Sequence, residues 1–393
     1  MQDPILLDVL LVLVLVASLV NGYRSGLVRS LSGIAGIIAG GTVAFFLVPL
    51  IGPWIPAPEW RTPVTLGAAL VLVLGGFTVG ESIGHAIRRR AHRTKLRVVD
   101  RVLGAGVALV ATALVISMLA FSIGALGVPF LSPAIASSGT VRTINELTPD
   151  PVERFLAQLR SSAVEDGLPR IVEAFTGPSP EIPDVDTGSP ALVTAARSVL
   201  KITGNAYACG QNQSGSGFVV AAGRVVTNAH VVAGVSEPVV EVPGGGALPG
   251  RVVYFDPVDD LAVIAVSGLT AAPLELTGNL APGTEAVTDG YPLGGPFDSD
   301  PAEVISVAAV GVADIYGRNP SPRQVYTLAS DVQQGESGGP LLSLGGEVAG
   351  VIFAKAQDTP NVGYALAMEE LAPVAARAAS LDSPVASGHC VND

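Results

Sequence analysis

The sequence predicts a multi-domain protein: an all-α domain of four transmembrane helices, then an all-β domain that ends in a helix. The mean hydropathy is +0.52 and only 14% of the 393 residues are charged. Soluble domains carry about 25% charged residues, so part of this chain is expected in lipid. Long apolar stretches occur in the first third, whereas short β-forming runs alternate with Gly and Pro turns from residue 198 onward. That second pattern favours an all-β barrel or sandwich.

Four apolar stretches are each near the length of about 20 residues that crosses a bilayer as a helix. The first is short enough to resemble a signal-peptide core. However, Asp3 stands where a basic residue is usual, and no small-residue cleavage site follows before the next stretch. Residues 1–128 are therefore predicted to form a membrane domain, with spans at residues 5–20, 31–51, 64–84 and 102–128.

Basic residues predict the orientation of these spans, because loops rich in Lys and Arg stay in the cytoplasm. A dense basic run, residues 88–97, separates the third and fourth spans, while Arg24 and Arg29 lie between the first and second. Four spans with both of these loops inside place both termini outside. We therefore expect a multi-pass protein of the inner (plasma) membrane, with its β-rich half on the periplasmic side and the lipid bilayer as one of its partners.

The charge distribution excludes one class of partner. The formal net charge is −12, and residues 1–128 hold ten basic and five acidic residues, so the remainder carries −17. An acidic C-terminal half argues against nucleic-acid binding. The sequence also lacks a Cys-x-x-Cys motif or a His cluster, so neither a metal nor a cofactor is expected.

The two halves are joined by a predicted linker with short helices, residues 129–190. Residues 177–184 within it are rich in Pro and read as an exposed, extended segment that is easily cut, so self-cleavage there is conceivable. The β-rich domain then covers residues 191–393, with helical composition at residues 368–379. Its strands are predicted at residues 217–220, 224–226, 239–242, 252–255, 261–266, 304–312, 325–328 and 348–353.

Three motifs in the β-rich half point to nucleophilic catalysis. Thr-Asn-Ala-His-Val contains His230, Asp-Asp-Leu-Ala-Val contains Asp260, and Gly-Glu-Ser-Gly-Gly-Pro contains Ser337. A serine hydroxyl becomes a nucleophile when a positioned histidine takes its proton, and a carboxylate orients that histidine. Asp260 is the expected acid because it directly precedes an apolar strand, and its neighbour Asp259 is the alternative.

A Gly-x-Ser-x-Gly pattern also occurs in a plain glycine-rich turn and in the nucleophile elbow of α/β-hydrolases. The elbow requires the order Ser, Asp, His and a helix after the serine. Here His389 is the one histidine after Ser337, and residues 341–353 read as two β runs around a Gly-Gly turn. His85 and His92 lie in or beside a membrane segment. His230 is therefore the favoured base.

On these motifs, residues 191–390 resemble trypsin/chymotrypsin-like serine proteases, in particular their bacterial HtrA-like branch. The resemblance implies two six-stranded barrels, with His230 and Asp260 in the first and Ser337 in the second. It implies that His230 is the base, Ser337 the nucleophile and Asp260 the orienting acid. The backbone N–H groups of Gly335 and Ser337 would form the oxyanion hole.

Two further features follow from that resemblance. Glu336 stands where the family more often has Asp, which in the animal enzymes pairs with a newly cut N-terminus, so that activation mechanism is not expected here. Asp331, six residues before Ser337, occupies the position that forms the base of the specificity pocket and favours Arg or Lys before the cut. The opposite wall would be formed by Phe353 and Lys355, and Lys355 would partly neutralise Asp331.

The membrane half resembles the colicin V production (CvpA) family, on its hydropathy and on the glycine-rich turn at residues 21–26. The combination with a trypsin-like domain is similar to actinobacterial membrane-anchored serine proteases. That resemblance implies cleavage of cell-envelope proteins in the response to envelope, acid or oxidative stress. It does not imply an acid optimum, because a general-base histidine must be neutral to work and ordinarily becomes protonated near pH 6.5.

Cys209 and Cys390 both lie in the half predicted outside the cytoplasm. Two free thiols are one possibility, but an oxidising compartment favours a disulfide bond between them. The bond would tie the C-terminal tail to the first barrel.

The leading functional hypothesis is a membrane-tethered serine endopeptidase. One alternative is a membrane scaffold with an inactive protease-like domain. Another is a transporter with a regulatory protease domain, in which Asp8 or Glu81 of the spans would serve ion passage.

Overall fold

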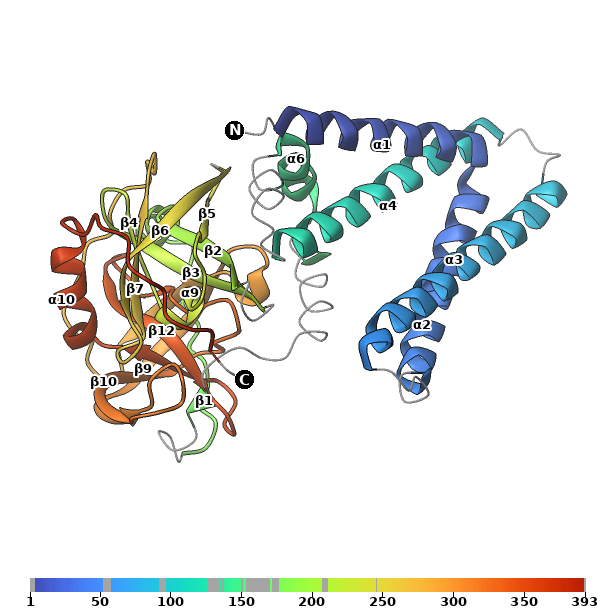
Figure 1. Cartoon of the computed structure of the whole chain (residues 1–393). Helices are drawn as coiled ribbons and strands as arrows, with labels where there is room; N and C mark the ends of the chain where they lie inside the picture. Colours follow the sequence, from blue (N-terminus) through green and yellow to red (C-terminus); the bar gives the residue numbers. More distant parts are fainter. Residues whose placement is uncertain are drawn as a thin grey trace. The chain divides into compact units, whose positions relative to one another are not determined.

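The computed structural model describes residues 4–51, 58–91, 97–125, 135, 138–149, 151–152, 170–171, 177–206, 211–244 and 246–391. Two compact units are distinguished: residues 5–117 form one, and the described residues from 118 onward form the other. Figure 1 labels the helices and strands of both units. The predicted order, an apolar helical region followed by a β-rich domain with a C-terminal helix, is confirmed.

The first unit is built from long apolar helices. They are α1 (Pro4–Ser25), α2 (Leu27–Ile51), α3 (Pro58–Ala91) and α4 (Arg97–Ala125). Gly26, at φ 78°, interrupts the helix between α1 and α2, a backbone conformation that glycine adopts without steric cost. Among the described residues, three segments are long and apolar enough to cross a membrane, and the apolar part of α3, Val71–Ile87, is shorter. The three are Ile5–Ser25, Leu27–Ala44 and Val98–Ser117.

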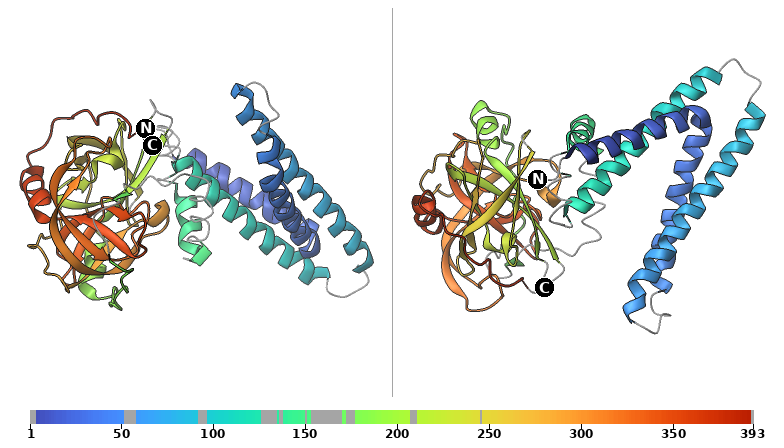
Figure 2. Two further views of the ribbon diagram at one scale, coloured as in Figure 1. Left: turned by 90° about the horizontal axis from the view of Figure 1, so that it is seen from below. Right: turned by 45° about the horizontal axis from the view of Figure 1, so that its top comes forward.

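Helices α2 and α3 lie side by side in both views of Figure 2, and glycines allow this close approach. A Cβ atom added to Gly36 would overlap the carbonyl oxygen of Gly76, and one added to Gly80 would overlap that of Ser32. A Cβ on Gly76 would lie 2.9 Å from the Cα of Gly40. In lipid, where helix association depends on van der Waals contact, such small residues let two backbones touch.

An ion pair joins the same two helices. Arg29 Nη2 donates to Glu81 Oε2 at 3.1 Å, and Arg29 Nε lies 3.0 Å from Glu81 Oε1. The first contact is a hydrogen bond, whereas Nε has no hydrogen-bond partner among the described residues and its contact is an ion pair. Glu81 is therefore paired within the helix hairpin.

The second unit begins with short helical segments and then forms a closed six-stranded barrel, in the order β2-β3-β4-β7-β6-β5. The helices are α6 (Gly139–Leu147) and α8 (Pro190–Ala196), and the predicted helices elsewhere in the linker fall largely outside the described residues. The strands are β2 (Val199–Ala206), β3 (Gln211–Ala221), β4 (Arg224–Thr227), β5 (Val239–Val242), β6 (Gly246–Asp256) and β7 (Leu261–Val266), with α9 (Ala229–Val232) following β4.

Six further strands close a second barrel, because β12 pairs with both β11 and β13. A two-residue strand, β1 (Arg170–Ile171), adds in parallel to the edge of β12. The predicted C-terminal helix is α10, Met368–Ala378. The strands are β8 (Glu285–Gly290), β9 (Asp298–Val312), β10 (Ser321–Ala329), β11 (Pro340–Ser343), β12 (Val348–Ala356) and β13 (Val362–Leu366), with a 3-10 turn, η2, at Pro292–Gly294.

The two barrels share one apolar core in addition to their own interiors. Phe218 and Leu261 of the first barrel belong to the same buried cluster as Phe353 and Leu366 of the second. Each is at most 1% exposed, and burying such a side chain stabilises the fold by about 1.5–3 kcal/mol. Leu371 of α10 extends this cluster. The seam between the barrels is therefore packed as tightly as a domain interior.

Gly76→Leu is expected to force α2 and α3 apart, because no side chain fits between the backbones of Gly76 and Gly36. Overpacking of this kind costs about 1–3 kcal/mol, so the detergent-solubilised full-length protein should melt at a lower temperature when helix content is followed by circular dichroism. Gly75→Leu is the matched control, since nothing lies within 4 Å of a Cβ at Gly75. Equal melting temperatures for the two variants would contradict the tight contact.

Candidate active site

The three motifs identified in the sequence meet at the seam of the barrels. His230 lies in α9 and Asp260 directly precedes β7, both in the first barrel, while Ser337 lies in the turn before β11 of the second. A Cβ added to Gly338 would lie 3.0 Å from the backbone nitrogen of Asn228 and would overlap the Thr227 hydroxyl. The turn that carries Ser337 thus lies against the segment that leads into His230.

Asp260 and His230 form a buried pair. The Nδ1 atom of His230 lies 2.8 Å from Asp260 Oδ2, and the backbone N–H of His230 donates to Asp260 Oδ1 at 2.9 Å. The two residues are 8% and 2% exposed, respectively. Both carboxylate oxygens therefore hold the imidazole, one through its ring and one through its backbone, which leaves Nε2 on the opposite edge of the ring.

Asp260 adopts a left-handed backbone conformation, with φ at 54°. A non-glycine residue there costs free energy unless its surroundings hold it. Asn228 supplies part of that support, because its side-chain amide donates to the Asp260 carbonyl oxygen at 2.8 Å. The neighbouring Asp259 makes a different contact, since its backbone N–H donates to Asp256 Oδ1 at 3.1 Å.

Ser337 is 2% exposed, and its hydroxyl has no hydrogen-bond partner among the described residues. Its carbonyl oxygen accepts from the backbone N–H of Ser216 at 2.8 Å, which anchors the serine turn to β3 of the first barrel. Buried polar atoms are usually paired, so an unpaired hydroxyl beside a histidine–aspartate pair marks a candidate nucleophile.

The backbone around Ser337 leaves a specific pair of donors unused. Within the described residues, no backbone hydrogen bond is donated by the N–H groups of Gly335 or Ser337. Among the other N–H groups of this turn, those of residues 336, 338 and 339 donate to the carbonyls of Gln333, Ile352 and Glu336, respectively. Two unengaged N–H groups two residues apart are the donors that an oxyanion hole requires.

Ser216 holds this loop in place, a role that no sequence motif predicted. Its hydroxyl donates to the Gly335 carbonyl oxygen at 2.7 Å and accepts from the backbone N–H of Tyr291 at 3.0 Å. Gly335 itself has φ at 96°, and a Cβ there would overlap the Tyr291 carbonyl. A serine within a Gly-Ser-Gly strand carries no signal of this role, because the contact is made only when the barrels meet.

Behind the serine turn lies a group of buried acids. Glu336 is 1% exposed, and its Oε2 atom accepts from the Gln333 backbone N–H at 2.6 Å, whereas Oε1 has no hydrogen-bond partner among the described residues. Burial, followed by the charge of Asp300, raises the pKa of Glu336 well above its usual range. Burial and the charge of Asp300 therefore both favour the neutral form of the Glu336 carboxyl group.

Asp289, on β8, is 1% exposed. Burial raises its pKa to about 7, the hydrogen bond from Ser299 works in the opposite direction, and the charges of Asp300 and Asp298 raise it further. The Ser299 hydroxyl donates to Asp289 Oδ1 at 2.6 Å, whereas Oδ2 is buried without a partner among the described residues. Ionisation of Asp289 therefore leaves charge on an unsolvated oxygen.

A cavity of about 250 Å³ lies beside the serine turn, lined by residues 330–332 and 355–362. Two of the three predicted specificity residues, Asp331 and Lys355, line it and place opposite charges on its wall. Phe353 does not line it, because its side chain is 1% exposed and packs in the core shared by the barrels.

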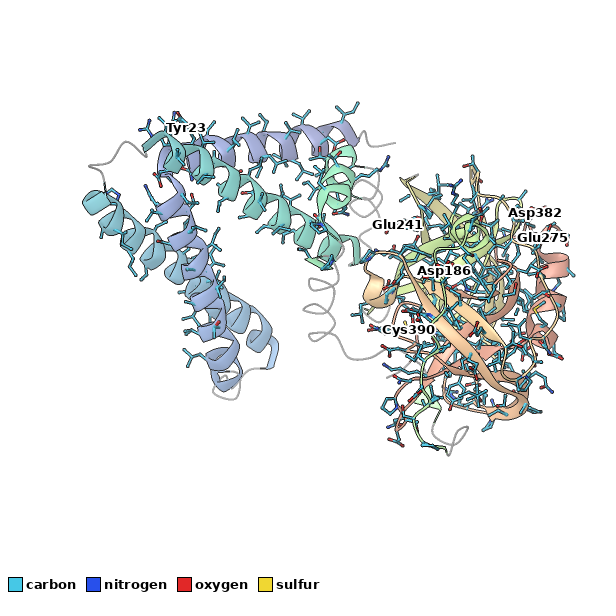
Figure 3. The ribbon with its side chains drawn as sticks, turned by 180° about the vertical axis from the view of Figure 1, so that it is seen from behind. Tyr23, Asp186, Glu241, Glu275, Asp382 and Cys390 are labelled. Atoms are coloured by element: carbon cyan, nitrogen blue, oxygen red, sulfur yellow. The ribbon has the colours of Figure 1, made fainter. Side chains whose placement is uncertain are left out.

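Cys390 is 7% exposed and packs against Ala206 and Val235 of the first barrel (labelled in Figure 3). Cys209 lies outside the described residues. The predicted disulfide bond between the two thus stays a prediction, although Ala206 is only three residues before Cys209. Among the described residues, no group of three or more His, Cys, Asp or Glu side chains is arranged so that it could hold a metal ion.

Comparison with known proteins identifies both halves. Residues 7–149 match the family model of the colicin V production protein, and residues 215–351 match the trypsin-like peptidase domain. Over 98% of both chains, the sequence is 35% identical to the serine protease Rv3671c of Mycobacterium tuberculosis (strain H37Rv). A protein from Ectopseudomonas mendocina, named a probable periplasmic DegP-like serine endoprotease, is 36% identical over 39% of this chain and 33% of its own.

Among solved structures, the active form of the Rv3671c protease from M. tuberculosis superposes with a TM-score of 0.52 at 37% sequence identity. The match covers all of that chain and 56% of this one. The two halves predicted from hydropathy and motifs thus occur together in a full-length relative.

Asp289→Asn is expected to change how stability depends on pH. The folded-state pKa of about 7 lies above the ordinary value of 3.8, so Asp289 favours the folded state fully below about pH 4 and loses that contribution as the pH rises through 7. The difference is at most about 4 kcal/mol, since each pKa unit corresponds to about 1.4 kcal/mol. The melting temperature of the variant should therefore exceed that of the wild type at pH 8 and equal it at pH 4.

The control for this measurement is Asp184→Asn, at an exposed position of the linker. It removes one carboxylate without altering a buried site, and its melting temperature should follow the wild type across the pH range. A parallel pH dependence for the wild type and Asp289→Asn would show that Asp289 is not buried as a neutral acid.

Proposed function

Since this chain belongs to the family of membrane-associated, trypsin-like serine proteases, we propose that it hydrolyses peptide bonds through a triad of Ser337, His230 and Asp260. The observation that carries the proposal is the buried His230–Asp260 pair, which is held by two hydrogen bonds at the seam where the unpaired Ser337 hydroxyl lies. Asp259 is not part of this pair, which supports Asp260 as the acid.

In the proposed reaction, Ser337 Oγ attacks the carbonyl carbon of the scissile bond while Nε2 of His230 takes its proton. The N–H groups of Gly335 and Ser337 stabilise the oxyanion of the tetrahedral intermediate. His230 then gives the proton to the leaving amine, and an acyl-enzyme forms on Ser337. Water then attacks the acyl-enzyme in the same way and releases the carboxylic acid product. Asp260 orients the imidazole and stabilises its charged form. The missing Ser337–His230 hydrogen bond is expected to form with substrate in place, as such bonds tighten in complexes.

We assign the cavity at Asp331 and Lys355 to the side chain that precedes the cut. Its wall carries one charge of each sign, so the basic preference suggested by Asp331 is weakened by Lys355. Specificity then depends on how closely a substrate cation approaches Asp331, whose Oδ2 atom accepts from the Gln333 amide at 3.3 Å.

The proposed domain organisation is a membrane domain at residues 1–128, a linker at residues 129–190 and a protease domain at residues 191–393. The basic loops of the membrane half support a multi-pass arrangement with the protease domain on the periplasmic side. Its substrates would then be proteins of the cell envelope, consistent with the periplasmic assignment in the name of the Ectopseudomonas relative. A role in envelope, acid or oxidative stress, and self-cleavage in the linker, belong to the same proposal.

A disulfide bond between Cys209 and Cys390 is part of this proposal, because both would lie in an oxidising compartment. The burial of Cys390 against Ala206, close to Cys209 in the chain, supports it. Cross-linking so long a loop would stabilise the domain by up to about 5 kcal/mol in the chain-entropy model.

The transporter alternative loses support. It relied on Asp8 or Glu81 as an ion-conducting carboxylate of the spans, and Glu81 is engaged by Arg29 in a two-point ion pair. Experiments can distinguish the hypothesis of an inactive scaffold from that of an active protease.

Replacing Ser337 or His230 by Ala is expected to lower kcat/KM for peptide hydrolysis by about 10⁴-fold or more, because triad members act as a unit. Asp260→Ala should be nearly as severe and Asp259→Ala mild. A fluorophosphonate probe should label the wild-type full-length protein and not Ser337→Ala. A wild type that neither reacts with the probe nor cleaves a peptide library would favour the scaffold alternative.

The proposed topology predicts the outcome of reporter fusions. Alkaline phosphatase, which folds only outside the cytoplasm, should be active when fused after residue 190 and silent when fused within residues 88–97, because the basic run retains its loop in the cytoplasm. The reverse pattern would overturn both the orientation and the envelope location of the substrates.

A further inference from the structure

Arg323 is a fully buried cation at the seam of the barrels that the proposed mechanism does not use. It lies on β10 of the second barrel and is 2% exposed. Its Nη2 atom donates to the carbonyl oxygens of Val312, at 3.2 Å, and of Ala313, where β9 ends. Its Nε atom has no partner among the described residues. Burying a guanidinium is costly unless negative charge compensates it.

That compensating charge comes from the segment that carries Asp260. Burial lowers the pKa of Arg323, and carboxylates around it act in the opposite direction, with Asp260 first. An arginine keeps its proton in proteins even so. The carboxylates whose charges act on Arg323 are, largest first, Asp260, Asp259, Glu370 and Asp256. Asp256 ends β6, and Asp259 and Asp260 lie in the loop that leads to β7.

A second contact ties the same two segments together through the backbone. The N–H of Ile315, two residues after Ala313, donates to the carbonyl oxygen of Pro257 at 3.0 Å. The Ile315 side chain packs in a buried cluster with Ala229, the residue before His230. The chain that Arg323 holds at the end of β9 therefore contacts both the Asp260 loop and the His230 helix.

We propose that Arg323 is a positioning residue of the triad, which holds the Asp260 loop of the first barrel from the second barrel and stabilises the negative charge of Asp260. This inference rests on the proposed triad. Within the described residues, the hydrogen bonds to the Asp260 carboxylate come from His230 alone. Arg323 is thus the charge that stabilises Asp260 from the other barrel.

The proposal has a consequence for activity in acid. A positive charge near the His230–Asp260 pair disfavours the uptake of a further proton, which would inactivate the base. Without Arg323, the buried cation that offsets the charges of Asp256, Asp259 and Glu370 would be lost. The remaining groups of this region do not replace it: burial raises the pKa of Tyr254 to about 12, so it is neutral. The exposed Arg377 lies over the Tyr254 ring at 4.5 Å.

The test is the pH profile of kcat/KM for full-length Arg323→Gln, measured from pH 4 to 9 and normalised by titration of reactive serine with a fluorophosphonate. We expect the midpoint of the acid limb to move up by about 0.5–1 pH unit, a shift typical of a nearby charge. The plateau should fall about 10-fold or more, because small displacements of catalytic groups are costly. Arg377→Gln is the matched control, and its acid limb should not move.

Arg323→Lys separates charge from position and is the fallback if Arg323→Gln does not fold. An ammonium group keeps the charge but lacks the planar guanidinium whose Nη2 atom donates to both carbonyls, so the acid limb should stay in place while the plateau falls. An unmoved acid limb in Arg323→Gln, or a full plateau in Arg323→Lys, would overturn the inference. A wild type that does not react with the fluorophosphonate would instead overturn the proposed triad.

Discussion

The burial of Asp260 is the constraint on which the arrangement of the site depends. Its carboxylate is removed from water and its backbone is left-handed, and both conditions cost free energy unless neighbouring groups compensate. His230 and Asn228 compensate from the first barrel, through the carboxylate and the carbonyl, respectively. The proposed compensating cation, Arg323, comes from the second. On that proposal, the geometry of the histidine–aspartate pair depends on the packing of the two barrels against each other.

The two sides of the serine turn differ in electrostatics. On the Asp260 side, a buried cation faces several carboxylates. On the other side, Glu336 and Asp289 are buried among acids, and burial raises the pKa of both. Burial thus favours the neutral form of both carboxyl groups. Because these acids bind protons more tightly in the folded state, acidification strengthens the fold around the serine turn.

The membrane half relies on shape more than on charge. Gly36 and Gly76 permit contact between the α2 and α3 backbones, and Arg29 and Glu81 add an ion pair in the same hairpin. Removing Cβ atoms at the contact is the way helices approach closely in lipid, where burial of apolar surface gives no driving force. A carboxylate that is paired in this way is a structural element of the hairpin.

The sequence by itself determined the fold class, since helical spans are set by apolar length and the strands by β-forming runs between turns. It also singled out the candidate catalytic residues, because His230, Asp260 and Ser337 each lie in a recognisable local motif. Only the tertiary structure decided what surrounds them. Ser216 and Arg323 lie in unremarkable strands, and the groups that give them their roles, Gly335 for Ser216 and Asp260 for Arg323, belong to the other barrel. Such contacts depend on how two closed barrels pack against each other, and local sequence patterns contain no information about that packing.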